Sequence, residues 1–122
     1  MSEIGEIIRE VAREEMPPGF AVMYRGFWMT FENGYSISIQ FCHGNYCDNE
    51  NDEYSRRLIY VIGVNPPYSQ CRNAEILISN RDGENITHEF AKDGDRIEHC
   101  DIGDVTPERL AEIIARIKRR KK

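Results

Sequence analysis

The strongest structural signal in this chain lies in residues 27–42, Phe-Trp-Met-Thr-Phe-Glu-Asn-Gly-Tyr-Ser-Ile-Ser-Ile-Gln-Phe-Cys. Asn33-Gly34 is the dipeptide that a two-residue type I′ turn favours, because both central residues of that turn have φ > 0. On each side of this dipeptide apolar and polar side chains alternate, so that one face of each segment is apolar. The pattern predicts a β-hairpin with strands over residues 27–32 and 35–42.

Two helices are predicted outside this hairpin. Apolar residues at helical spacing cover residues 3–15, and Pro17-Pro18-Gly19 ends the pattern. Near the other end of the chain, Thr106 is a typical N-cap and Pro107 is favoured at the first helical position. The apolar stripe of this C-terminal helix is made of Leu110, Ile113, Ile114 and Ile117.

Strand signals fill most of the chain between the two helices. Residues 20–24 are predicted to begin the first strand, which Arg25-Gly26 interrupts with a bulge. Residues 58–64 form an almost continuous apolar run and are predicted to be the central strand. Further strands are predicted over residues 74–79, 86–90 and 96–100. These signals predict an α+β fold with a meander-like antiparallel sheet of about six strands and an N-terminal and a C-terminal helix.

The length and composition indicate one globular domain covering residues 1–122. A chain of 122 residues, 40% hydrophobic and 30% charged, is long enough for one core and too short for two. The longest apolar runs have the length of a strand, so we expect no membrane contact. The acidic, amphipathic N-terminus lacks the pattern of a secretion signal, which favours the cytoplasm.

Charge is divided unevenly along the chain. Six of the 16 basic side chains lie in residues 116–122, so the other residues carry 10 basic side chains against 21 acidic ones. An acidic body repels a phosphate backbone, and we therefore expect no binding to long nucleic acid. The basic tail either contacts an acidic partner or is a solvated helix end that complements the helix dipole, and the second interpretation is favoured.

The cysteines do not follow the spacing of a known metal site or disulfide framework. They stand at positions 42, 47, 71 and 100, with no Cys-x-x-Cys pair. A zinc site would need side chains from distant segments to converge. The possible ligands are Cys42 or Cys47, His43, Cys71 and His99. Four free thiols in a reducing compartment are the simpler interpretation, and we expect no bound metal.

No catalytic set is evident either. Cys47 beside His43 or His88 would resemble a nucleophile with its base, but no recognised local motif accompanies them. Glu50 and Asp52 belong to an acidic loop that lacks the calcium-binding pattern and is more simply a solvated surface. We expect no catalytic residue and no cofactor, and therefore a protein that is not an enzyme.

Arg109 and Arg116 are the more informative charged residues. They lie seven apart on the predicted C-terminal helix and flank its apolar stripe, where we expect them at the surface edge of the helix. Guanidinium groups in such a place bind phosphate oxygens or stack on a base. The alternative is that Glu112 pairs with them along the helix, and the sequence alone favours this simpler interpretation. Arg56 and Arg57 could supply further cations. Aromatic side chains offer flat surfaces on which a purine could stack, and these are Tyr35, Tyr46, Tyr54, Tyr60, Phe90 and Trp28.

With these features the chain resembles the type-one Thoeris anti-defence proteins of bacteriophages. The resemblance rests on an acidic chain of this length, a helix with spaced arginines, and the hairpin over residues 31–40 followed by Gly44-Asn45-Tyr46-Cys47. It implies a protein in the host cell cytoplasm that binds and sequesters a cyclic ADP-ribose isomer made by TIR-domain enzymes, without cleaving it. Members of the family assemble from dimers and can hold cyclic oligonucleotides at separate sites.

The resemblance also implies which residues bind the ligand. In the family, arginines of the C-terminal helix and an aromatic side chain line a pocket between subunits. Arg109 and Arg116 match these arginines by their position on the helix, and Arg57 and Phe90 are implied as companions. The family's pocket asparagine has two candidates in this sequence, Asn80 and Asn85.

A different class of function fits the same sequence. The chain would then be a protein-binding inhibitor or adaptor, which presents a sheet edge or its acidic loop to a host defence protein. A small enzyme that uses Cys47 or His43 is a third and weaker alternative.

Overall fold

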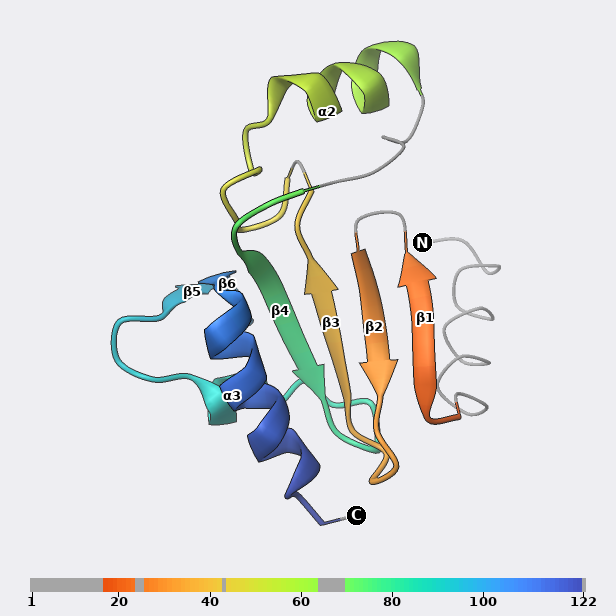
Figure 1. The fold of residues 1–122 in the computed structure, drawn as a ribbon, viewed down its shortest axis with the longest axis vertical. Helices are drawn as coiled ribbons and strands as arrows, with labels where there is room; N and C mark the ends of the chain where they lie inside the picture. The colour runs from red at the N-terminus through yellow and green to blue at the C-terminus, as the bar shows by residue number, and fades with distance from the viewer. Residues whose placement is uncertain (1–16, 24–25, 43, 64–69, 122) are drawn as a thin grey trace.

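The computed structural model describes residues 17–23, 26–42, 44–63 and 70–121 (Figure 1). The helix predicted over residues 3–15 lies outside these ranges, as do Tyr24 and Arg25 at the predicted bulge. No helix among the described residues is both long enough and apolar enough to span a bilayer.

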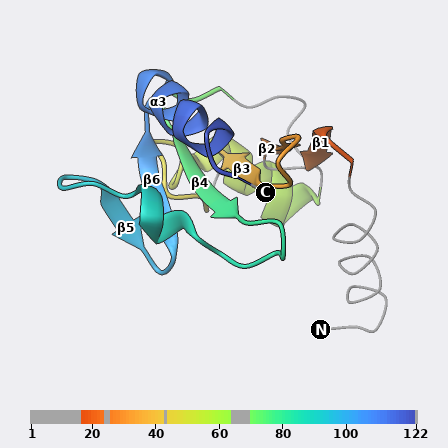
Figure 2. The ribbon, with the colours of Figure 1, turned by 90° about the horizontal axis from the view of Figure 1, so that it is seen from below.

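Six antiparallel strands form one sheet in the order β1-β2-β3-β4-β6-β5. The strands are β1 (Gly19–Met23), β2 (Gly26–Thr30), β3 (Ser36–Gln40), β4 (Ala74–Ser79), β5 (Arg96–Glu98) and β6 (Asp101–Val105). Helix α3 (Pro107–Lys118) covers one face of the sheet, over β4 (Figures 1 and 2). The predicted α+β class, the antiparallel sheet and the C-terminal helix are therefore confirmed.

The predicted apolar face of the hairpin is also confirmed. Phe27 pairs with Ile39 and Met29 pairs with Ile37, so the four side chains share one face of the sheet. Ile37 is fully buried and Ile39 is 3% exposed. The remaining core side chains come from the neighbouring strands, from α3 and from the segment after β4, and are Ala74, Ile76, Ile78, Ile86, Phe90, Ile102, Val105, Ile113 and Ile117.

The turn of this hairpin is not the predicted type I′ turn. Phe31 N donates to Tyr35 O, and Gly34 N donates to Phe31 O, which is the pattern of a three-residue loop. Gly34 has φ 90, whereas Asn33 has no positive φ. The side chain of Asn33 explains the difference, because its Nδ2 donates to the carbonyl oxygens of Ile117 and Arg120, each at 2.9 Å. The turn thus satisfies the last carbonyl groups of α3.

Residues 58–63 do not form the predicted central strand, and Val64 lies outside the described residues. They follow the short helix α2 (Glu53–Arg57), and Leu58–Ile62 form a π-helix, η1. Gly63, with φ 80, ends η1 and donates its N–H to Leu58 O. A short apolar run is compatible with either a strand or a helix, so the pattern alone could not separate the two. The run is not central to the core, because Val61 is 72% exposed.

The prediction was also wrong after β4. Residues 86–90 were expected to form a strand, but Thr87–Phe90 form a 3₁₀ helix, η2. The Thr87 hydroxyl accepts a hydrogen bond from Ile78 N at 2.8 Å and so replaces a backbone partner. The strand that follows β5 along the chain and pairs with it is β6, Asp101–Val105. It was not predicted, because this segment contains only two apolar residues besides Gly103.

Replacement of Ile76 by alanine should lower the free energy of unfolding by about 2–5 kcal/mol, because the side chain is fully buried and its removal leaves a cavity. The matched control is Ile97→Ala on the edge strand β5, where the side chain is 52% exposed. This change should cost about 1 kcal/mol or less. Urea denaturation of both variants measures the difference, and equal losses would contradict the described core.

Candidate functional site

Three of the four predicted ligand residues lie together, where α3 packs against η2. Phe90 is the last residue of η2 and is fully buried. Arg109 Nη2 donates to the carbonyl oxygen of Phe90 at 2.8 Å, and Arg116 Nη1 donates to the same oxygen at 3.4 Å. The helix therefore directs both guanidinium groups to one point on η2.

Local sequence explains how α3 positions these arginines. The Thr106 hydroxyl accepts the Arg109 N–H at 3.2 Å and caps the helix, and Pro107 stands at its first turn as predicted. Ile113 and Ile117 are fully buried against the sheet. Arg109 and Arg116 are two turns apart, so they lie on the same border of this apolar stripe.

The Phe90 ring is covered by two cations. The guanidinium carbon of Arg116 lies 5.0 Å from the ring centroid, and that of Arg120 lies 4.6 Å from it. Arg120 Nη1 is 2.6 Å from Glu89 Oε1, and this hydrogen bond raises the pKa of Arg120 and lowers the pKa of Glu89. We call Phe90, Arg109, Arg116 and Arg120 the Phe90 cluster.

Arg109 is a buried member of this cluster and does not lie at the surface edge of the helix. Its side chain is 11% exposed and pairs at 3.1 Å with Asp95, whose side chain is 10% exposed. Glu112, the alternative partner in the sequence, is farther away at 3.8 Å. The Nε of Arg109 is buried without a hydrogen-bond partner among the described residues. Arg109 thus holds the Asp95 turn against α3, because a buried charge is costly without its partner.

Arg116 differs from its two neighbours in the cluster. Within the part of the chain that the structure describes, its hydrogen bonds go to the carbonyl oxygens of Phe90 and Glu89, and it pairs with no carboxylate. Arg109 and Arg120 each have a carboxylate partner. Arg116 is exposed, and a guanidinium carries five N–H groups. It is therefore the charge in the cluster that remains available to an anion.

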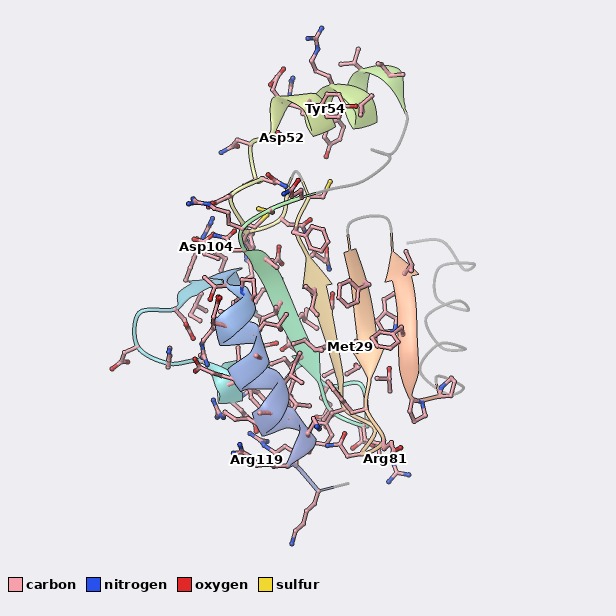
Figure 3. The ribbon with its side chains drawn as sticks, in the orientation of Figure 1. Met29, Asp52, Tyr54, Arg81, Asp104 and Arg119 are labelled. Carbon is pink, nitrogen blue, oxygen red and sulfur yellow. The ribbon has the colours of Figure 1, made fainter. Side chains whose placement is uncertain are left out.

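Arg57 does not join the Phe90 cluster within one chain. It is an exposed residue at the end of α2. Helix α2 lies at one end of the molecule, whereas α3 ends near the other, as the labels on Tyr54 and Arg119 show (Figure 3). Asn80 and Asn85 are in the turn after β4, where Asn80 Oδ1 accepts backbone N–H groups and Asn85 Oδ1 accepts from Thr87. Both asparagines thus stabilise their own turn.

A second polar cluster was not predicted from the sequence. Glu75 lies on β4 between the buried residues Ala74 and Ile76, so its side chain points to the face opposite α3. Its Oε1 accepts hydrogen bonds from Tyr46 N at 2.8 Å and from Asn45 Nδ2 at 3.3 Å. Burial, followed by a hydrogen bond and the negative charge of Glu75, raises the pKa of Asp101 to about 7. Asp101 therefore keeps a proton up to near neutral pH.

Strand β6 beside this carboxyl pair has an unusual backbone. His99 and Asp104 have φ 56 and 54, in the left-handed region, and the pairing of β4 with β6 shifts register between Ala74 and Ile76. A Cβ on Gly103 would lie 2.8 Å from the Tyr46 carbonyl oxygen, so only glycine fits there. Strained backbone and a raised carboxyl pKa together mark this region as a second candidate site.

One arginine, Arg96, pairs with three other carboxylates. Arg96 is 2.8 Å from Glu50, 3.4 Å from Asp104 and 3.5 Å from Glu98. Its guanidinium carbon lies 5.2 Å from the centroid of the Tyr46 ring. Glu50, which the sequence placed in a solvated acidic loop, is thus half-buried and paired with β5.

The possible zinc ligands do not gather in the described part of the chain, which contains no group of three or more side chains placed to hold a metal. His43 lies outside the described residues. Cys47 is 3% exposed, and burial raises the pKa of its thiol to about 12. A thiol held protonated in this way is a poor nucleophile at neutral pH.

A pocket of about 310 Å³ lies near the N-terminal end of α3. Its wall is mainly apolar, and Cys71, Arg72 and Asn73 add polar atoms. The full lining is Ile39, Phe41, Gln70, Cys71, Arg72, Asn73, Ala74, Val105, Pro107 and Leu110. The pocket does not include any residue of the Phe90 cluster.

No protein-family model, curated protein or solved structure matches this chain.

The raised pKa of Asp101 predicts a pH effect on stability. Unfolded aspartate has a pKa of about 3.9, so between about pH 4 and pH 7 the unfolded chain releases this proton before the folded protein does. The free energy of unfolding should therefore fall as the pH rises through this window. Asp101→Asn, which keeps the shape of the protonated carboxyl group, should remove this part of the decline.

Urea denaturation at a series of pH values from 4 to 8 measures this effect, and Asp82→Asn in an exposed turn is the control. Parallel pH curves for the wild type and Asp101→Asn would contradict the raised pKa of Asp101, whereas Asp82→Asn should follow the wild type.

Proposed function

We propose that this protein binds a cyclic nucleotide signal and sequesters it without cleaving it, using the Phe90 cluster. The observation that carries the proposal is Arg116, an exposed guanidinium without a carboxylate partner among the described residues, which stacks on Phe90 beside Arg120. A guanidinium with unused N–H groups binds phosphate oxygens in a fork. The ligand is therefore a phosphate-bearing molecule, and a cyclic ADP-ribose isomer is the expected one.

The cluster suits binding better than turnover. Arg109 is tied to Asp95 and the Phe90 carbonyl group, so it fixes η2 against α3 and positions its neighbours. Arg116 then lies on a prearranged surface, which lowers the entropy lost when a ligand binds. Sequestration of a scarce signal needs this affinity and requires no general base or nucleophile.

The proposed site is shared between two copies of the chain. Arg57 is too far along the molecule to reach the Phe90 cluster of its own chain, since α2 and the end of α3 lie at opposite ends (Figure 1). In a two-fold dimer, α2 of one copy can approach α3 of the other. Arg57 of the second copy would then supply a further cation to the phosphates. Such an assembly agrees with the resemblance to the phage anti-defence family and with action in the host cell cytoplasm.

One observation favours a protein partner as the second candidate function. Helix α2 and η1 expose several large apolar side chains, which are Tyr54, Tyr60, Val61 and Ile62 at 63%, 62%, 72% and 64%. Such a patch suits a protein interface. If no nucleotide binds, an inhibitor or adaptor that docks through α2 and η1 onto a host defence protein becomes the leading function.

The first test replaces Arg116 by alanine. Loss of a charge-assisted contact to phosphate should weaken binding of the cyclic ADP-ribose isomer by about 1.5–3 kcal/mol, with little effect on folding because the side chain is exposed. Titration calorimetry measures the affinity. Lys118→Ala removes an equal charge from the same helix and should bind as the wild type does.

The ligand recovered after heat denaturation of the complex should be chemically intact. A cleaved product would contradict sequestration. An affinity for the nucleotide that is unchanged in Arg116→Ala would contradict the Phe90 cluster as the site.

The second test asks whether two chains share one site. Arg57→Ala and Arg116→Ala homodimers should both bind weakly. A heterodimer with one chain of each variant keeps one site with both arginines, because Arg57 of one chain meets Arg116 of the other. Co-purified, differently tagged chains should therefore bind one nucleotide per dimer with the wild-type affinity. A heterodimer as weak as its two parents, or a wild-type protein that binds as a monomer in light scattering, would contradict the shared site.

A further inference from the structure

Cys47 and Cys71 belong to two segments that hydrogen bonds hold side by side. Asp48 N donates to Asn73 Oδ1 at 2.8 Å, and Arg72 Nε donates to Asp48 Oδ2 at 2.8 Å. Asn49 Nδ2 donates to Gln70 O at 2.9 Å. Each of these contacts joins a residue close after Cys47 to a residue within two positions of Cys71, so the two cysteines are brought to the same place.

The two thiols lie close to one another. Both are free, and Cys71 is near enough to contribute to the raised pKa of the Cys47 thiol. Cys47 Sγ also donates to Cys42 O at 3.8 Å, and Cys71 Sγ donates to Asn73 Oδ1 at 3.7 Å. Burial raises the pKa of the Cys47 thiol to about 12, and the adjacent Cys71 adds to this rise.

The two thiols differ in their access to solvent. Cys47 is 3% exposed, whereas Cys71 is half-buried and lines the pocket of about 310 Å³ at the N-terminal end of α3. A small reagent in this pocket meets Cys71, whereas Cys47 is not part of the pocket wall. An accessible thiol backed by a second thiol is the arrangement of a redox-responsive pair.

We propose that Cys71 and Cys47 form a reversible disulfide by exchange with a low-molecular-weight disulfide such as oxidised glutathione. The Cys71 thiolate attacks one sulfur of the reagent, releases the first glutathione thiolate and forms a mixed disulfide. The Cys47 thiolate then attacks the Cys71 sulfur, and the second glutathione thiolate leaves. The two protein thiols lose two electrons and two protons, and one disulfide molecule is reduced to two thiols.

The new bond would close a covalent ring over residues 47–71. This ring contains α2 and η1, and therefore the exposed apolar side chains Tyr54 and Val61 as well as Arg57. A cross-link of this length reduces the conformational freedom of the unfolded chain and so stabilises the fold. Oxidation would thus join the two ends of the segment that contains α2 and η1, which carries the second candidate interface.

Peptide mapping of the full-length protein tests the proposal. The protein is incubated with excess oxidised glutathione, blocked with iodoacetamide and digested without reduction. We expect a Cys47–Cys71 cross-linked peptide, which dithiothreitol reverses, and a melting temperature several degrees above that of the reduced protein. The rate of ring closure should increase about tenfold per pH unit between about pH 7 and pH 9, because the fraction of Cys47 thiolate rises at that rate below its pKa.

Three variants separate this pair from ordinary thiol oxidation. Cys47→Ser should stop at a mixed disulfide of Cys71 with glutathione, and Cys71→Ser should leave Cys47 reduced. Cys100→Ser removes an exposed thiol outside the pair and should still form the cross-link. The proposal is overturned if the wild type accumulates only the mixed disulfide, or if Cys71 pairs with Cys42 or Cys100. It is also overturned if both thiols remain open to alkylation.

Discussion

Burial of isoleucine side chains beneath α3 is the interaction on which the rest of this structure depends. Ile37 of β3, Ile76 of β4 and Ile102 of β6 form one face of the sheet, and Ile113 and Ile117 of α3 cover it. Fully burying one such side chain stabilises a fold by roughly 1.5–3 kcal/mol. The contact also sets the rotation of α3 about its axis. The rotation of α3 in turn determines where the polar residues of the helix lie.

The Phe90 cluster is a consequence of that rotation. With the isoleucines facing the sheet, Arg109 and Arg116 lie along the border of α3, and η2 brings the buried ring of Phe90 beneath them. The same side chains therefore contribute to the fold and to the charge of the surface. Arg109 forms an ion pair with Asp95, whereas Arg116 donates hydrogen bonds only to carbonyl oxygens among the described residues. The buried Arg109 therefore stabilises the fold, whereas the exposed Arg116 remains available to an anion.

The opposite face of the sheet carries a polar cluster in place of an apolar core. Glu75 and Asp101 lie where the β4–β6 pairing shifts register. Glu75 accepts a hydrogen bond from Tyr46 N, and burial, followed by a hydrogen bond and the negative charge of Glu75, raises the pKa of Asp101. The left-handed conformations of His99 and Asp104 cost free energy that the surrounding contacts must offset. Arg96 joins this region to the loop that carries Glu50 and Tyr46. The protein thus carries its two unusual polar clusters in separate places.

Local patterns were sufficient for part of this fold. Alternation predicted the apolar face of β2 and β3, and the Thr106 cap with helical periodicity predicted α3 and its apolar stripe. These signals depend on near neighbours in the chain, so they can be read without the partner segments. The meeting of Arg109, Arg116 and Phe90 was anticipated as a set of site residues, although their intramolecular partners were not.

Other features depended on contacts between distant segments. The apolar run over residues 58–62 became a π-helix, and Asp101–Val105 became a strand, because sheet positions are filled by pairing rather than by apolar content alone. Asn33 forms a different turn because it caps a helix more than eighty residues away. The raised pKa of Asp101 beside Glu75 and the proximity of Cys47 to Cys71 likewise depend on groups far apart in sequence. Periodicity describes which face a residue occupies, and only the folded chain decides which residue it meets there.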